Sequence, residues 1–488
     1  MGLWTRKDIN TLQMEALAGA DVHGNSLKRV LSAYQLIMLG IGAIIGAGIF
    51  VITGEAAANY AGPGVMFSFM VAALGCFFAG LCYAEFASMI PVAGSAYTYA
   101  YATLGEFIAW IIGWDLVLEY LVASSTVSVG WSGYFTAFMH EIGIFIPAVL
   151  TSAPLAYNDG QFHLTGSFIN FPAVLLVGII TSILVFGIEM SARFNNVIVM
   201  IKVAVVLLVI GIGIQHINWA NLDPLVPPNT GKFGEYGFSG VIRASAVVFF
   251  AYIGFDAVST AAQEAKNPQR DMPIGILGSL AICTVLYILM AFVMTGLAHY
   301  TTLNVPHPVF VAINTLGPTY AWLGMLVNIG AIMGLASVIL VLLMGQPRIF
   351  MSMSRDGLLP GAFGRVHSKY RTPYVGTIIT GSAAAILGGL LPIDVLGKLV
   401  SMGTLLAFVI VCAGVLVLRH TSPDLKRPFR TPFLPFVPLA GIGICGYMMV
   451  SLPAETWLLV TVWTVIGLAI YFLYGKKRSR LGKAAAAE

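Results

Sequence analysis

Four glycines stand close together in an apolar stretch near the start of the chain, at positions 40, 42, 46 and 48. Glycine costs about 1 kcal/mol relative to alanine inside a helix, so this stretch predicts a broken helix. The N–H groups of Gly46, Ala47 and Gly48 would begin its second half, where the positive end of the helix dipole favours a carboxylate. The C=O groups of the first half, around Ile44, favour an ammonium. One break thus offers a partner to both charges of a zwitterion.

A second glycine interrupts another apolar stretch, where Gly254 stands two residues before Asp256. The C=O groups of Phe250, Ala251 and Ile253 would complete an ammonium site. The ring of Phe250 could cover a ligand or serve packing alone. A pair of interrupted stretches at corresponding places in the chain indicates a binding site near the middle of a membrane. The alternative for the first stretch is close helix–helix packing, which glycines at four-residue spacing also provide.

Four ionisable residues fall deep inside apolar stretches: Asp115, Glu119, Lys202 and Asp256. Each costs about 2.5–3.5 kcal/mol on insertion scales and is a functional candidate by default. Asp115 and Glu119 are four residues apart, so they share one face of a helix. An apolar surrounding disfavours the charged form of a lysine, which would let Lys202 lose and regain a proton. We expect Lys202 to carry a driving proton, with the three carboxyl groups as relay or partner groups. The alternative is a permanent ion pair between Lys202 and one of them.

The elements that hold these residues are apolar helices. Of the 488 residues, 58% are hydrophobic and 9% are charged, and the mean hydropathy is +0.89. Soluble proteins carry about 25% charged residues. Apolar stretches of about 20 residues can cross a bilayer. They recur here at 32–54, 64–89, 97–137, 170–190, 194–216, 238–262, 274–298, 319–346, 374–392, 395–418, 433–451 and 456–474. The sequence therefore predicts an all-α integral membrane protein with twelve transmembrane helices.

The basic residues follow this arrangement. Of the 25 Lys and Arg residues, all except Lys202, Lys232, Arg243 and Lys398 fall in segments on one side. This asymmetry predicts that both termini are cytoplasmic, and it fits a multi-pass protein of the cell membrane. A nucleic-acid partner is excluded, because the basic residues form loop clusters instead of one continuous patch. Glu85 and Glu106, near helix ends, are expected to reach the membrane surface.

Signs of an enzyme or a metal centre are missing from the sequence. The five cysteines lie inside apolar stretches, which argues against disulfides and against a metal site. No zinc-protease, nucleophile-elbow or phosphate-loop motif is present. We expect neither catalysis nor a cofactor, with transport driven by a proton gradient.

Several motifs carry a family resemblance. They are Gly42–Phe50, Gly113–Tyr120, Ala251–Asp256 followed by Glu264 and Asn267–Pro268, Pro347–Arg348, and Ser354–Pro360. Together they resemble the amino acid–polyamine–organocation transporter superfamily, above all its cationic amino acid transporter branch and bacterial relatives.

The resemblance implies the leucine-transporter fold and amino acid transport by alternating access. Ten core helices would form two inverted five-helix repeats over residues 31–418, with two peripheral helices over 419–474 and cytoplasmic tails over 1–30 and 475–488. The substrate carboxylate would meet the N–H groups of residues 46–48. Its amino group would meet the C=O groups of Ile44, Phe250 and Ile253. Lys202 matches a lysine whose amine, in proton-coupled relatives, stands where sodium-coupled members place an ion.

The choice of substrate is expected to depend on the eighth apolar stretch. Ile332, Met333 and Gly334 are apolar there, and Met333 is bulky enough to fill space that a long side chain needs. We therefore expect proton symport of small neutral L-amino acids such as alanine. The alternative is exchange of cationic amino acids without proton coupling. Beside the substrate and the bilayer, specific lipids or a small accessory membrane protein are candidate partners.

Overall fold

The structure is a computed structural model that describes residues 4–8, 31–90, 95–158, 161–186, 192–262, 265–370 and 372–481. Most of the predicted tails, at 9–30 and 482–488, and Glu264 of the family motif lie outside the described residues.

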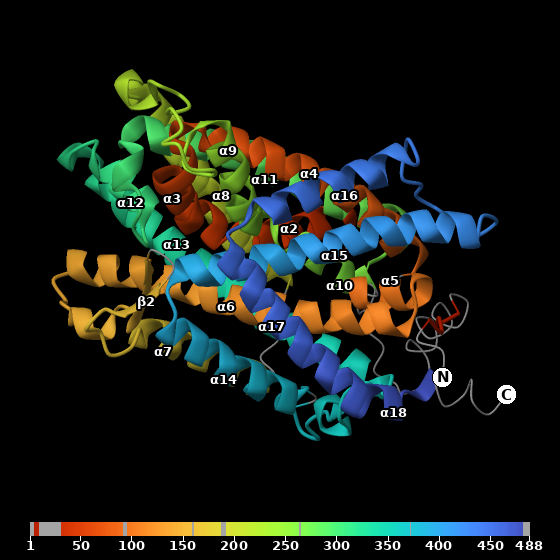
Figure 1. Cartoon of the computed structure of the whole chain (residues 1–488). Helices are drawn as coiled ribbons and strands as arrows, with labels where there is room; N and C mark the ends of the chain where they lie inside the picture. The colour runs from red at the N-terminus through yellow and green to blue at the C-terminus, as the bar shows by residue number, and fades with distance from the viewer. Residues whose placement is uncertain are drawn as a thin grey trace.

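The described chain forms one bundle of long helices (Figure 1). Eight helical stretches in it are long and apolar enough to cross a membrane: Gly48–Met89, Glu106–Glu141, Asn196–His216, Gly237–Thr260, Pro268–Leu297, Pro318–Arg355, Ile393–Thr421 and Ala454–Arg478. Four shorter apolar helices accompany them: Ala33–Ile44, Phe171–Phe186, Tyr374–Leu390 and Phe436–Ser451. The prediction of a mostly helical membrane protein is confirmed. The division into twelve crossings stays a prediction, because these four helices are shorter than the about 20 residues of a full crossing.

The individual elements are given by length, each group in chain order. The longer helices are α2 (Ala33–Ile44), α4 (Val65–Met89), α5 (Ser95–Thr103), α6 (Glu106–Glu141), α7 (Phe171–Phe186), α8 (Ala192–Gly213), α9 (Gly237–Val248), α11 (Pro268–Leu297), α13 (Ala321–Arg355), α14 (Tyr374–Leu390), α15 (Ile393–Thr421), α16 (Phe436–Ser451) and α17 (Ala454–Ile470). The short helices are α3 (Thr53–Ala56), α10 (Ala257–Thr260), α12 (Pro308–Asn314) and α18 (Lys476–Arg478). Single turns that matter below are η1 (Gly48–Ile52) and η7 (Phe249–Tyr252).

Two predicted boundaries were wrong. The stretch predicted at 97–137 is two helices, α5 and α6, because Gly105 takes a φ of 98° between them. The stretch predicted to end at residue 346 continues to Arg355 with Pro347 inside the helix. The segment between Glu141 and Phe171 contains a hairpin of β1 (Leu155–Asn158) and β2 (Gln161–Leu164), which pair antiparallel.

The long helices α6 and α11 organise the bundle. α6 packs along α13, α14 and α15, and α11 packs along α2 and α4. Small residues bring α2 and α11 close together: Gly275 of α11 faces Leu36 of α2, and Gly40 of α2 faces Ser279 of α11. Close packing against α11 therefore holds α2 in place up to the helix break that follows it.

Glu85 and Glu106 do not reach the surface as predicted. Glu85 is 1% exposed, and it accepts hydrogen bonds from Arg419 at 3.0 and 2.8 Å and from the Thr431 N–H at 2.7 Å. Arg427 lies 3.3 Å from the same carboxylate. Glu106 is 4% exposed and accepts hydrogen bonds from the hydroxyl groups of Tyr101, Tyr471 and Ser479. These buried carboxylates are tolerated because Glu85 is paired with arginines and Glu106 accepts several hydrogen bonds.

We expect the Glu85→Ala change to destabilise the protein by about 3–5 kcal/mol, because it leaves two arginines beside an unfilled buried site. The measurement is the melting temperature of the purified protein in detergent. The matched control is Glu455→Ala at the exposed start of α17, which should leave the melting temperature unchanged. Equal melting temperatures for the Glu85 and Glu455 variants would contradict the assigned role.

Candidate binding site at two helix breaks

The first break lies where the sequence predicted it. α2 ends at Ile44, and Ile45 takes extended backbone angles (φ −71°, ψ 99°). After Gly46 and Ala47 the chain continues as η1, a wide turn of π-helix. Such turns interrupt regular helices at functional sites. The first N–H groups of a helix lack partners within it, so this end can accept an anion.

The second break is built differently. α9 passes into η7, a tighter turn of 3-10 helix, and the chain then leaves the helix at Ile253 (φ −58°, ψ 134°). Gly254 follows with a φ of 115°, which favours glycine. The Phe250 carbonyl accepts from the Ile253 N–H at 3.2 Å and keeps a second lone pair. The Phe250 side chain is buried at 5% exposure, and its role as a lid stays a prediction.

The two breaks touch each other. A Cβ atom on Gly48 would overlap both Cα and Cβ of Ala251, and a Cβ on Gly254 would come within 2.9 Å of the Ala43 backbone. The residues predicted for the site on both stretches, namely Ile44, Gly46, Ala47, Gly48, Phe250, Ala251, Ile253 and Gly254, are therefore brought together. For Gly48 and Gly254 the backbone contact itself requires glycine.

Tyr287 of α11 joins the two breaks and was not among the residues predicted for the site. Its hydroxyl oxygen lies 2.7 Å from the Ile44 carbonyl and 2.9 Å from the Ala251 carbonyl. The side chain is fully buried. A single tyrosine in an apolar helix has no neighbouring pattern that would mark it, and only the spatial approach of α11 reveals its position.

Lys202 of α8 also contacts the first break, at other carbonyl groups than Tyr287 does. Its Nζ donates to the Gly42 carbonyl at 2.8 Å, to the Ile45 carbonyl at 3.1 Å and to Ser337 Oγ of α13 at 3.2 Å. An ammonium has three N–H donors, and each finds an acceptor here. Among the described residues no Asp or Glu pairs with it, so the alternative of a permanent ion pair is not what the structure contains. Ser337 was a further residue that the sequence did not single out.

Comparison with known proteins identifies the family of the chain. A family model described as amino acid permease matches residues 31–474. The chain is 46% identical over 481 residues to the methylthioribose transporter of Bacillus subtilis, which covers 99% of both chains. It is 48% identical to the branched-chain amino acid permease BcaP of Bacillus subtilis, over 96% of this chain and 98% of that protein. The human cationic amino acid transporter 4 is 36% identical over 81% of this chain and 60% of its own length.

The chain belongs to the amino acid permease family. It is therefore a multi-pass membrane transporter of the amino acid–polyamine–organocation superfamily and not an enzyme. Relatives of the cationic amino acid transporter group are more distant than the bacterial ones named above. The predicted superfamily is confirmed.

In this permease the predicted carboxyl groups fall into two places. Asp256 accepts from the Gly254 N–H at 3.2 Å and from the Tyr120 hydroxyl at 3.3 Å, so it supports the second break. Glu119 lies near Asp256 in the same buried region, and its Oε1 has no hydrogen-bond partner among the described residues. These two carboxyl groups are brought together beside the breaks, whereas Lys202 contacts neither.

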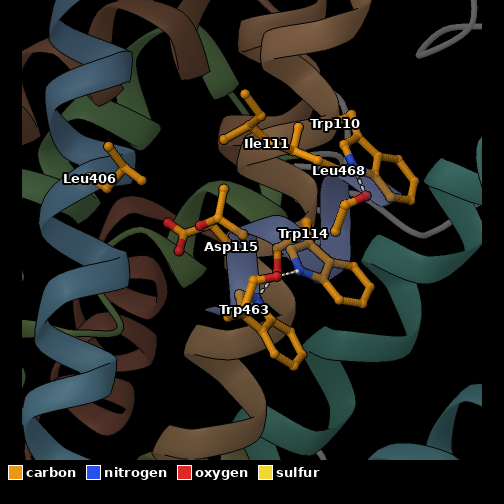
Figure 2. Close-up of a pocket in the computed structure, with 9 residues that line it drawn as sticks. Trp110, Ile111, Trp114, Asp115, Leu406, Trp463 and Leu468 are labelled. Carbon is orange, nitrogen blue, oxygen red and sulfur yellow. Dashed lines mark hydrogen bonds between the residues drawn. The ribbon is translucent and has the colours of Figure 1, made fainter. Parts of the chain in front are cut away.

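Asp115 faces a different region, between α6, α15 and α17 (Figure 2). Trp114 and Trp463 stack there at 4.5 Å, and each indole N–H donates to the backbone carbonyl of the other residue. The small cavity beside them has about 10 Å³, room for about one water molecule. Asp115 Oδ2 has no hydrogen-bond partner in the described part of the chain. The structure therefore places Asp115 between α6 and α15, with its Oδ1 beside Gly403, and not at the breaks.

Met333 is not brought to the breaks either. It is 36% exposed, whereas the face of α13 that meets the first break carries Gly334, Ser337 and Val338. Val338 lies against Gly46, with its Cγ2 3.1 Å from the position that a Cβ would take there. The predicted role of Met333 as the wall of a side-chain pocket is corrected: apolar residues lie on several faces of α13, so their pattern did not show which face turns inward.

Proposed function

We propose that this permease is a proton-coupled symporter of neutral L-amino acids that works by alternating access in a bacterial cell membrane. The observation that carries the proposal is the position of Lys202, whose amine joins α2, α8 and α13 at the first break. Both termini would be cytoplasmic, as the distribution of Lys and Arg favours. Family membership supports the leucine-transporter fold, with inverted repeats over 31–418 and peripheral helices over 419–474.

The two breaks would hold the backbone of the amino acid. The N–H groups of Gly46, Ala47 and Gly48 offer donors to the carboxylate at the positive end of a helix dipole. The carbonyl groups of Ile44 and Ile253 offer acceptors to the amino group. Tyr287, already beside the Ile44 carbonyl, would orient this side of the site.

Proton coupling follows from what Lys202 donates. A charged amine has three N–H donors and satisfies all three acceptors, whereas a neutral amine has only two. Loss of the proton from Lys202 would therefore break at least one hydrogen bond between α8 and its neighbours, and α2 could then move relative to α13. Glu119 and Asp256 would serve as relay groups. Asp115 keeps a relay role only as a more remote member of this group.

Neutral aliphatic substrates are favoured by the wall beside the break. Val338 is apolar and 4% exposed, and no cation-binding carboxylate accompanies it on the described face of α13. The name of one similar protein refers to branched-chain amino acids and that of another to methylthioribose. We therefore place substrates from alanine to the branched-chain amino acids first. Exchange of cationic amino acids without proton coupling is the competing function.

Two measurements test this function. The first ranks the twenty amino acids by the rise in melting temperature that each gives the purified protein. The second measures uptake of the best ligand into proteoliposomes, with and without an inward proton gradient. A rise with alanine, valine or leucine and gradient-dependent accumulation support the proposal. Arginine as the best ligand, with exchange that ignores the gradient, would favour the competing function.

The Val338→Ala change should admit larger side chains, because it removes two methyl groups beside Gly46. We expect affinity for leucine to rise relative to alanine by about 10-fold, the usual value of one or two methylene groups in a pocket. The Met333→Ser change is the matched control on the same helix and should leave the ranking unchanged. A ranking that responds to Met333 and ignores Val338 would contradict the assignment.

A further inference from the structure

A groove of about 630 Å³ lies outside the two breaks, at the end of the bundle where α11 begins. Its walls include Arg270, Ile274, Leu277 and Gly278 of α11, and Pro428 and Phe429 of the segment that leads into α16. None of these residues contributes to the site described above. The groove is open to the outside of the bundle, so its occupant must come from the membrane or its surface.

The α11 wall is a stripe with a charged end. Positions 270, 274, 277 and 278 recur at helical spacing, so they share one face of α11. Arg270 is exposed at the end of the helix, and Ile274 is 39% exposed one turn further in. The groove is therefore cationic at its mouth and apolar along its length.

The opposite wall is held in place before any ligand binds. The Arg427 guanidinium donates to the backbone carbonyls of Ser422 at 2.7 Å and Leu425 at 2.7 Å, which folds the segment after α15 around it. The Phe429 N–H donates to Ser88 Oγ of α4 at 3.3 Å. Because the backbone of Phe429 is fixed to α4, the groove is a built feature of the fold.

The charges at the mouth favour an anion. Glu85 is already shared by Arg419 and Arg427. Arg270 has no ion-pair partner among the described residues, and Lys426 and Arg430 are exposed on either side of Phe429 in the sequence. Arg270 thus lines the groove without a carboxylate of the described chain bound to it, and two further exposed cations flank the opposite wall in the sequence.

The length of the groove distinguishes a lipid from a helix. From Arg270 to Gly278 the helix rises about 12 Å, close to the about 15 Å of one leaflet's hydrocarbon. A transmembrane partner helix would need a surface of about 30 Å. The dimensions fit one acyl chain of a lipid whose headgroup stays at the membrane surface.

We propose that this groove binds an anionic phospholipid, with the phosphate beside Arg270 and an acyl chain along Ile274 and Leu277. Basic pockets between transmembrane helices bind such headgroups through charge, while the chain adds apolar burial. Gly278 and its neighbour Gly275 also face Ile37 and Leu36 of α2. The bound lipid would therefore lie against the helix pair that supports the first break. This inference does not depend on the substrate or on proton coupling.

Native mass spectrometry of the full-length protein tests the proposal. Delipidated protein in detergent is titrated with phosphatidylglycerol and, separately, with phosphatidylcholine. We expect phosphatidylglycerol to bind more tightly, and the Arg270→Gln change to weaken its binding about fivefold, as loss of one cation near a membrane surface does. Binding of phosphatidylcholine should not change in this variant. The Ile274→Trp change, which fills the groove, should weaken binding of both lipids.

Two matched variants control for general effects. Ile282→Trp alters the same residue type on the same helix at a similar 42% exposure, outside the groove. Arg365→Gln removes an exposed arginine elsewhere on this side. Both should bind lipid as the unmodified protein does. The proposal is overturned if Arg270→Gln binds both lipids normally, or if Ile282→Trp loses as much lipid as Ile274→Trp. It is also overturned if the unmodified protein carries a bound polypeptide that the groove variants lack, while their lipid binding is unchanged.

Discussion

Replacing Lys202 by alanine is expected to abolish accumulation driven by a proton gradient while substrate exchange continues. The amine contacts the first break directly, through the Gly42 and Ile45 carbonyls. Coupling between two sites is typically worth 5–150-fold, and we expect a loss of about 100-fold in gradient-driven accumulation. The measurement is uptake of labelled amino acid into proteoliposomes with an imposed pH gradient, set beside exchange in vesicles preloaded with the same amino acid.

The Lys202→Arg change separates charge from proton release. An arginine stays charged under all ordinary conditions, so it can donate to the same carbonyls but cannot give up its proton. We expect this variant to lose gradient-driven accumulation as the alanine variant does. If Lys202→Ala still accumulates substrate in response to the gradient like the unmodified protein, Lys202 is not the coupling group.

Stability must be followed in the same variants. Removal of the amine leaves two carbonyl groups and Ser337 without a donor, at about 1–3 kcal/mol for each buried group. A lower melting temperature is therefore expected for Lys202→Ala. Retained exchange shows that the variant is folded, so it distinguishes loss of coupling from loss of structure.

Much of the fold could be predicted because apolar length is a strong signal. Each predicted stretch corresponds to a helix or a pair of helices, and the errors fall where a local feature overrides length. Gly105 divides one stretch in two, whereas Pro347 fails to end another. Glu85 and Glu106 are buried because Arg419, Arg427 and several hydroxyl groups reach them from distant parts of the chain, which no local pattern could reveal.

The candidate site could be predicted only where the backbone itself carries the signal. Glycines mark both breaks, since they are required by a positive φ at Gly254 and by the contact of Gly48 with Ala251. Side-chain positions were less accessible. Tyr287 is placed by the packing of α11, and Met333 lies away from the break because Gly334, Ser337 and Val338 form the face of α13 that packs there.

The Gly48→Ala change is expected to lower substrate affinity about 100-fold. A methyl group at this position would overlap Cα and Cβ of Ala251, so η1 and η7 must move apart. A displacement of about 1 Å at a site of this kind can cost about 100-fold in function. The measurement is equilibrium binding of labelled amino acid to the purified protein, together with its melting temperature. The Gly211→Ala change in α8, which meets nothing within 4 Å, is the matched control and should bind normally.

A graded series distinguishes a binding site from a packing seam. At Gly46 a methyl group would meet only the Val338 side chain at 3.1 Å, which can shift by a few tenths of an ångström, so we expect a milder loss than at Gly48. Adding Ala251→Gly to Gly48→Ala removes one overlapping atom but leaves the Cα, so affinity should recover only in part. If the glycines served packing alone, melting temperature would fall in the same order while the affinity of the folded protein stayed constant. Normal substrate affinity in the Gly48→Ala variant would therefore show that the glycines of the first break serve helix packing and not substrate binding.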